Sequence, residues 1–186
     1  ATIWKRTLWE GAFRITTTPV AGRNYLLYGS MDGTYGTIDR ATGECVWKNT
    51  TPSSEKYSHR IVTGSAAYKD GVFYIGLGNG DVVALAEDTG EVLWRIATDM
   101  SIYTVGHAMR DEPGVCASPV ISGGVLYIGA NDGILRGIDI ADGTLIWSCS
   151  LGVPITSSPG ISGNVLYIAS ADGHMYAFTH PRGHSK

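Results

Sequence analysis

Residues 118–147 read SPVISGGVLYIGANDGILRGIDIADGTLIW, and this stretch decides the fold. It contains short runs rich in β-branched and aromatic residues, such as VLYIG at 125–129, which are typical of β-strands. Asn131-Asp132-Gly133 and Asp142-Gly143 separate these runs, and Asp-Gly pairs favour the positive φ angles of tight hairpin turns. The stretch therefore predicts four short strands in an antiparallel meander.

The same order of motifs returns along the chain. Each copy has an apolar run, a turn ending in Gly, a second run and a second Gly-containing turn, and three copies end in a tryptophan. We expect a single propeller region over 1–186, with repeats at about 18–47, 65–94, 118–147 and 158–183. The last repeat stops before its tryptophan, whereas residues 1–9 supply a strand with Trp4, and this strand is expected to complete a blade.

A single meander cannot bury both of its faces, so such meanders must stack. Sheets that stack face to face around an axis bury both faces of each sheet. Trp4, Trp47, Trp94 and Trp147 are 43, 47 and 53 residues apart, one blade length each. The predicted fold is therefore all-β, a β-propeller of four-stranded antiparallel blades, with about four blades in this chain.

The composition supports a folded chain and narrows its partners. Of 186 residues, 44% are apolar and 17% are charged, so a sizeable core is available and disorder is excluded. The net charge of -3 gives no general attraction to phosphate, which argues against nucleic acid as a partner. No apolar run approaches the ~20 residues that span a bilayer, so no membrane insertion is expected.

The chain has three cysteines, Cys45, Cys116 and Cys149. Because their number is odd and they lack CxxC spacing, no disulfide framework is expected.

Three motifs carry a resemblance to a known family. They are Ile38-Asp39 through Thr42-Gly43-Glu44 to Trp47, Leu85 through Thr89-Gly90-Glu91 to Trp94, and Ile138-Asp139 through Asp142-Gly143 to Trp147. With them the chain resembles, over almost its whole length, the quinoprotein or pyrroloquinoline-quinone-like repeat family. The resemblance implies an extracytoplasmic setting, periplasmic or secreted. It also implies that each fourth-strand tryptophan docks on the neighbouring blade, over the small residue of a second strand. The expected docking residues are Trp4, Trp47, Trp94 and Trp147, with Gly29, Gly76, Gly129 or Ala169 beneath them.

The resemblance leaves two forms of ring open. Propellers of this family usually have about seven or eight blades. In one form, residues 1–9 complete the last blade and four blades close into a small ring. In the other, which is favoured because the connections and the tryptophan docking are those of larger rings, the chain is half of an eight-bladed ring. Its ends then pair with a second copy or with the remainder of a longer protein, and a chain that starts at Ala1 instead of Met is expected to be processed or excised.

The family also contains dehydrogenases that bind pyrroloquinoline quinone and Ca²⁺ in the central funnel. A fragment of such an enzyme is therefore an alternative. However, no two cysteines adjoin here, and Asp32, Asp132 and Asp172 fall in hairpin turns, where Asp caps its own turn backbone. Ser118 and Ser158 precede proline without a GxSxG motif, and the histidines lack metal-ligand spacing. We expect no catalytic residue, no metal site and no cofactor.

Two long connections, after Trp47 and after Trp94, carry the candidate binding residues, and Arg14 occupies a comparable connection. They are expected on the face of the Asp-Gly turns, beside the central funnel. Long polar and aromatic loops on a rigid scaffold are typical of recognition surfaces, although solvated insertions without function have the same composition. The candidate binding residues are Arg14, Tyr57, His59, Arg60, Tyr103, His107 and Arg110.

The predicted function is that of a non-catalytic propeller scaffold, part of a larger protein or assembly, which binds a protein partner, a second copy of the chain or a small ligand. A dehydrogenase fragment that binds pyrroloquinoline quinone and calcium is the first alternative. The second is a glycan-binding propeller in which Tyr57 and Tyr103 stack on a sugar.

Overall fold

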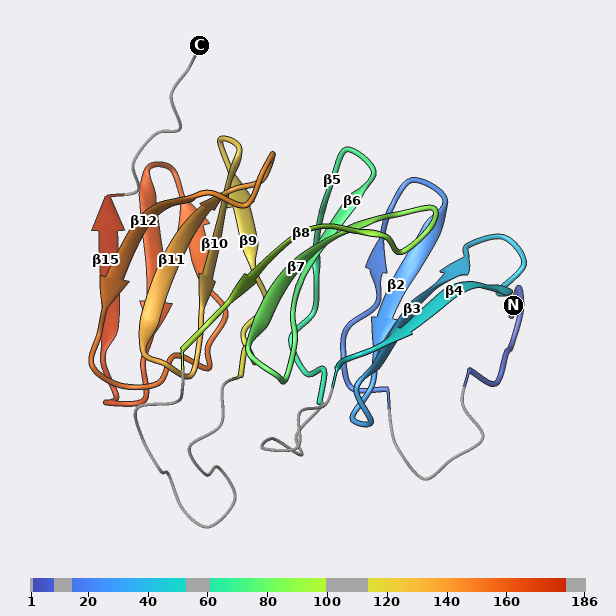
Figure 1. Ribbon diagram of the computed structural model, residues 1–186, viewed down its shortest axis with the longest axis horizontal. Helices are drawn as coiled ribbons and strands as arrows, with labels where there is room; N and C mark the ends of the chain where they lie inside the picture. Colours follow the sequence, from blue (N-terminus) through green and yellow to red (C-terminus); the bar gives the residue numbers. More distant parts are fainter. Residues whose placement is uncertain (1, 9–14, 53–60, 100–113, 180–186) are drawn as a thin grey trace.

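A computed structural model describes residues 2–8, 15–52, 61–99 and 114–179 of the chain. Its strands form four antiparallel sheets, which we number along the chain as blades 1 to 4 (Figure 1). Blade 1 consists of β1 (Val20–Ala21), β2 (Tyr25–Gly29), β3 (Thr34–Asp39) and β4 (Cys45–Thr50). Blade 2 consists of β5 (Ala67–Lys69), β6 (Val72–Gly76), β7 (Asp81–Ala86) and β8 (Val92–Ala97). Blade 3 consists of β9 (Val120–Ser122), β10 (Val125–Gly129), β11 (Ile134–Asp139) and β12 (Leu145–Ser150). Blade 4 has three strands, β13 (Gly160–Ser162), β14 (Val165–Ala169) and β15 (Met175–Thr179).

Each blade is a meander in which strands that follow one another in the chain pair side by side. The turns between them use glycine as the sequence predicts, because Gly33 and Gly133 have φ angles of 86° and 74°. The prediction of an all-β propeller with about four blades is confirmed. The described part of the chain has no helix with the length and apolar character that a membrane crossing demands.

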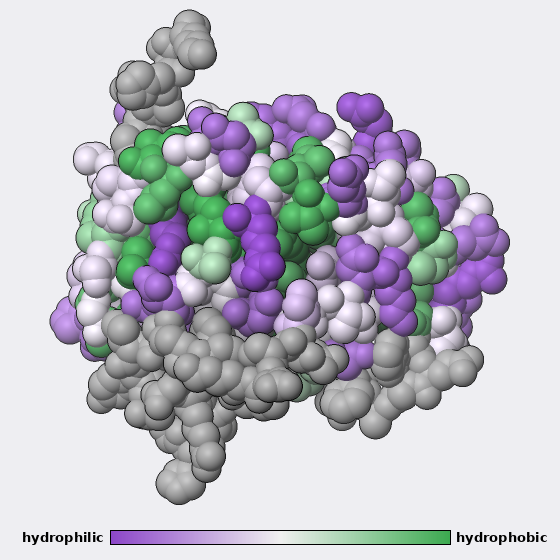
Figure 2. All heavy atoms as spheres, in the orientation of Figure 1, coloured by the Kyte–Doolittle hydropathy of each residue, from purple (hydrophilic) through white to green (hydrophobic). Residues whose placement is uncertain are grey.

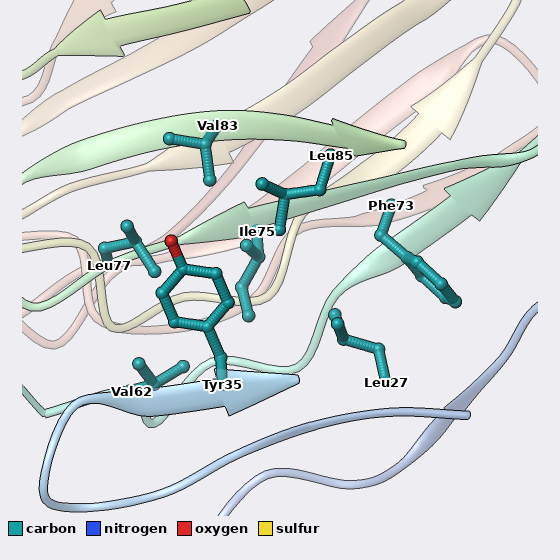
Figure 3. Packing of buried hydrophobic residues seen from close by; sticks show 8 residues of the cluster. All are labelled: Leu27, Tyr35, Val62, Phe73, Ile75, Leu77, Val83 and Leu85. Carbon is teal, nitrogen blue, oxygen red and sulfur yellow. The ribbon is translucent and has the colours of Figure 1, made fainter. Parts of the chain in front are cut away.

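The core lies between the blades. Figure 3 shows the cluster between blades 1 and 2, where Leu27 and Tyr35 of blade 1 face Phe73 and Leu85 of blade 2. Val62, which is fully buried, lies in the connection between these blades and closes the cluster at one end. Equivalent clusters join blade 2 to blade 3 and blade 3 to blade 4. The second and third strands of blades 1 to 3 are therefore largely buried, which explains their nearly continuous apolar sequence.

The four blades form an open row, with blade 1 at one end and blade 4 at the other (Figure 1). None of the apolar clusters of the described residues joins blade 4 to blade 1. The segment around Trp4 lies against blade 1, since its indole N–H donates to the carbonyl oxygen of Arg40 at 2.9 Å. Residues 2–8 pair with no strand of the described chain. A single copy thus has the open form, and not the small closed ring.

Candidate interaction face

One face of the blades is formed by the turns between the second and third strands. The fourth strands end on this face, because Thr51, Thr98 and Leu151 each donate a backbone hydrogen bond of 2.8 Å to the carbonyl of a turn glycine. The connections return on the same face, where the Val62 amide donates to the Ser30 carbonyl at 3.1 Å. The long connections between blades thus begin and end on what we call the turn face.

The predicted binding residues belong to these connections, or in the case of Arg14 to the segment before blade 1, and all lie outside the described residues. They are Arg14, Tyr57, His59, Arg60, Tyr103, His107 and Arg110. Both connections after Trp47 and Trp94 are anchored on the turn face at each end, since Val115 also donates to the Leu77 carbonyl there, at 3.1 Å. The assignment of these residues to binding stays a prediction.

The aspartates of the turn face cap their own turns, as the sequence predicts. The carboxylates of Asp32, Asp132 and Asp172 accept hydrogen bonds of 2.9 to 3.0 Å from the amide two residues further on. Burial alone would raise the pKa of Asp32, but hydrogen bonds from Ser30 and Thr34 outweigh burial and hold this pKa below its usual value. These carboxylates therefore stabilise the hairpins.

A buried ion pair lies on the turn face at blade 3. The Asp132 carboxylate receives both terminal guanidinium nitrogens of Arg136, and both side chains are more than nine-tenths buried. Asp132 also accepts from the amide of Asp99, at 3.1 Å, at the end of the fourth strand of blade 2. Since every oxygen of this carboxylate has a partner, the pair holds two neighbouring blades together and offers no free base.

Pyrroloquinoline quinone with Ca²⁺ does not fit the described residues of this face. A calcium site needs several carboxylate or carbonyl oxygens directed at one point. Here the turn aspartates point back to their own amides, and the guanidinium of Arg136 occupies the most buried of them. No group of three or more His, Cys, Asp or Glu in the described ranges could hold a metal ion.

The tryptophans of the fourth strands dock on the next blade. The indole N–H of Trp47 donates to the Glu87 carbonyl at 2.7 Å, and that of Trp94 donates to the Ile140 carbonyl at 3.0 Å. The Trp147 ring meets Phe178 of blade 4 edge-on, with 5.6 Å between the ring centroids. Trp47 and Trp94 thus connect two blades through the indole N–H, and Trp147 does so through its ring.

The place of docking differs from the expectation that the indoles lie over second-strand glycines. The indoles of Trp4, Trp47 and Trp94 cover glycines of the turns between third and fourth strands. A Cβ built on Gly43, Gly90 or Gly143 would lie 2.5 to 2.9 Å from the nearest indole atom. The atoms closest to Gly29, Gly76 and Gly129 belong instead to Val62, Val115 and Ile155. The fourth strand lies at the outer edge of its blade, so its indole meets the outer turn of the next blade and not its second strand.

A second repeated contact was not anticipated from the sequence. The Thr18 amide donates to the Ser65 hydroxyl at 2.9 Å, Ser65 donates to Ser118 at 2.8 Å, and Ser118 donates to Ser158 at 2.9 Å. We call this series the serine ladder. The signal was present in the sequence, because Ser or Thr recurs directly before each first strand. Ser118 and Ser158 are therefore joints between blades.

The outer strands expose apolar side chains between polar ones, as Figure 2 shows on one side of the molecule. Leu93 and Leu145, on β8 and β12, are exposed to 52% and 50%. All three cysteines of the chain are free thiols.

Comparison with known protein families assigns most of the chain to a family. A family model described as "Outer membrane protein assembly factor BamB" matches residues 78–186, which is more than half of the chain. Among curated relatives, the BamB of Shewanella oneidensis is 33% identical over 88 residues, covering 46% of this chain and 21% of that protein. The BamB of Xanthomonas campestris pv. campestris is 24% identical over 181 residues, covering 78% of this chain and 44% of that protein. The chain thus spans less than half the length of the curated relatives it matches.

Solved structures share the fold. BamB from Moraxella catarrhalis superposes with a TM-score of 0.70 at 20% identity, covering 89% of this chain and 46% of that one. The computationally designed Ika4 protein has a TM-score of 0.68 at 20% identity and covers 93% of this chain and 95% of that one. Quinohemoprotein alcohol dehydrogenase from Comamonas testosteroni has a TM-score of 0.67 at 15% identity, covering 84% and 29%. From the family match and these repeated blades, the chain belongs to the PQQ-like β-propeller repeat family of the outer membrane protein assembly factor BamB.

Proposed function

We propose that this chain is a non-catalytic propeller scaffold that binds a protein partner through its turn face. The observation that carries this proposal is the commitment of the turn-face carboxylates to their own hairpins and to the joint between blades 2 and 3. Such a face is rigid, and it presents the two long connections that start and end on it. A rigid platform with long loops favours recognition over chemistry.

The family suggests the setting and the kind of partner. Its curated relatives are named for outer membrane protein assembly. We therefore place the chain outside the cytoplasm, with another component of outer membrane protein assembly as its partner. No cofactor is part of the proposal, because the described carboxylates that a bound Ca²⁺ would need already have partners.

The test uses substitutions in the first long connection. Tyr57, His59 and Arg60 are changed together to Ala, and the control changes Asp88 and Glu91 to Ala, two exposed residues on the turn between β7 and β8. Each immobilised protein is mixed with an outer membrane extract of Shewanella oneidensis, and bound proteins are identified by mass spectrometry. We expect wild type and control to retain an outer membrane assembly component that the triple variant loses.

Equal retention by the triple variant, or no such component on the wild type, contradicts the proposed function. A second measurement addresses the alternative enzyme. Pyrroloquinoline quinone and Ca²⁺ are added to the wild type, and a rise in Tm together with dye reduction supports a dehydrogenase. We expect no change in either.

A further inference from the structure

Blade 4 has an apolar face that is covered in the other three blades. The third residue of the second strand faces the next blade and is buried in blades 1 to 3, where its exposure is 2% for Leu27, 3% for Tyr74 and 0% for Tyr127. The equivalent Tyr167 of blade 4 is exposed to 39%. Met175 is exposed to 75%, whereas the equivalent residues Tyr35, Val82 and Leu135 are 4%, 0% and 0% exposed. The open end of the row thus presents a surface of the kind that blades stack on.

Among the described residues, this blade has no fourth strand, and the N-terminal segment has the sequence of one. Thr2–Thr7 reads TIWKRT, close to CVWKNT of β4, with the tryptophan at the same place. β15 pairs with β14 on one side, and no described strand pairs with its other edge, whose backbone donors and acceptors are available to a further strand. In the described chain, residues 2–8 pair with no strand.

The N-terminal segment already docks on blade 1 as a fourth strand does. The Trp4 indole lies over Gly43 and donates to the Arg40 carbonyl, just as Trp47 lies over Gly90 and donates to the Glu87 carbonyl. It therefore occupies the place of the fourth strand of a blade that would precede blade 1. If a second molecule extends the row of blades beyond blade 1, blade 4 of that molecule takes this place.

The remaining joints are also complementary at the two ends. At one end of the serine ladder, the Thr18 hydroxyl is equivalent to the Ser65 hydroxyl, which accepts a hydrogen bond. At the other end, the backbone amide of Ser158 is equivalent to the Ser118 amide, which donates one. Ile15 stands three residues before Thr18, as the buried Val62 stands three before Ser65. Ile15 is 41% exposed, since no blade among the described residues covers it.

We propose that two copies of this chain associate end to end, with the Thr2–Thr7 segment of each copy forming the fourth strand of the other copy's blade 4. Each copy uses its first blade as one contact surface and its last blade as the other. Such head-to-tail contacts close into a ring when the rotation per copy allows it. Two copies of four blades give eight blades, with every joint of the row repeated at both junctions.

One residue makes the junction between copies weaker than the joints within a copy. Where blades 1 to 3 have glycine at the end of the second strand, blade 4 has Ala169. A Cβ built on Gly76 or Gly129 would lie 2.2 Å from the Val115 or Ile155 side chain, so a methyl group there forces the partner to shift. Replacement of Ala169 by Gly is therefore expected to strengthen the association.

The first test measures mass by light scattering during gel filtration over a range of concentrations. We expect a species of twice 19.8 kDa. Met175→Lys places a charge on the exposed face of blade 4 and is expected to give a monomer with unchanged Tm at low protein concentration. Leu145→Lys, which changes an equally apolar residue that is 50% exposed on β12, is the matched control and stays dimeric. Ala169→Gly lowers the dissociation constant severalfold.

The second test checks the strand register. In β3 and β4, Tyr35 is opposite Asn49, and the same register places Met175 opposite Arg6 of the other copy. With the native cysteines changed to Ser, the Met175→Cys/Arg6→Cys variant is expected to form a disulfide-linked dimer under mild oxidation. The Met175→Cys/Asp88→Cys variant is the control and does not. A wild type that is monomeric at all concentrations, an open-ended series of larger species, or a dimer without this cross-link overturns the proposal.

Discussion

At the scale of single residues, the joint between blades depends on glycines whose role is both conformational and steric. Gly90 has a φ of 71°, which L-residues with side chains rarely adopt, and the Trp47 indole lies where its Cβ would be. Gly71 has a similar φ of 85°, but no atom lies within 4 Å of the position of its Cβ. Substitutions at these two glycines therefore distinguish the free-energy cost of the left-handed backbone from the free-energy cost of displacing the indole.

We predict that Gly71→Ala lowers the free energy of unfolding by about 1 kcal/mol, the cost of a left-handed conformation for a residue with a side chain. Gly90→Ala should cost about 2 kcal/mol more, because the indole must also leave its site and its hydrogen bond to Glu87. Urea unfolding followed by tryptophan fluorescence measures both. Equal losses in the two variants would show that the indole contact contributes nothing.

At the scale of elements, the turn between β7 and β8 is attached to blade 1 by one carboxylate. Glu87 accepts hydrogen bonds from the amides of Asn24 at 2.9 Å and Tyr25 at 3.1 Å, and from the Tyr68 hydroxyl at 2.6 Å. Burial raises its pKa, but these three hydrogen bonds outweigh burial, so that the pKa of Glu87 lies below its usual value. The ionised form is therefore the one that holds the two blades.

This depressed pKa predicts a pH dependence of stability. The unfolded chain binds a proton to Glu87 at a higher pH than the folded chain does, so the contribution of Glu87 is present above the unfolded pKa and is lost as the pH falls through the folded pKa. Below about pH 5 the unfolding free energy of the wild type should fall more steeply than that of Glu87→Gln. Denaturant titrations from neutral to acid pH measure this, with Glu91→Gln as the exposed control. Parallel curves for all three proteins would contradict the assignment.

The elements themselves could be predicted from the sequence because they are governed by local signals. Apolar runs and Gly-containing turns recur at a fixed order, and the Asp32 and Asp132 caps follow from their place in a turn. The contacts between blades were harder to predict from the sequence, because they depend on which edge of one sheet meets which edge of the next. The indole of Trp47 could be assigned to a neighbouring blade but not to Gly90, and the role of Ser65 in the serine ladder needs coordinates to be seen. The candidate binding residues, such as Tyr57 and Arg110, stay predictions.

At the scale of the whole molecule, stability is expected to differ along the row. Blade 2 is covered on both sides, and the β7 strand is buried at five of its six positions. In blade 4 the β15 strand alternates between exposed and partly buried positions, and none of the described strands lies at its outer edge. Stacked repeats are stabilised by their neighbours, so the end unit opens most easily.

We predict that backbone amides of β14 and β15 exchange with deuterium at least tenfold faster than those of β6 and β7 in a dilute sample, because blade 4 then lacks a neighbour. At high concentration the amides of β15 should become protected if the end-to-end association forms. Hydrogen exchange followed by mass spectrometry gives both rates. Uniform protection of blades 2 and 4 in the dilute sample would contradict the prediction.

The serine ladder has a direction, since the amides of Thr18, Ser65 and Ser118, each just before a first strand, donate to the hydroxyl of the equivalent residue in the following blade. Blades 2 and 3 thus each donate on one side and accept on the other. Duplication or loss of one complete genetic unit, as by unequal recombination, therefore leaves every junction with a matching pair. Such chains can therefore gain or lose blades during evolution without needing a new kind of contact between neighbouring blades.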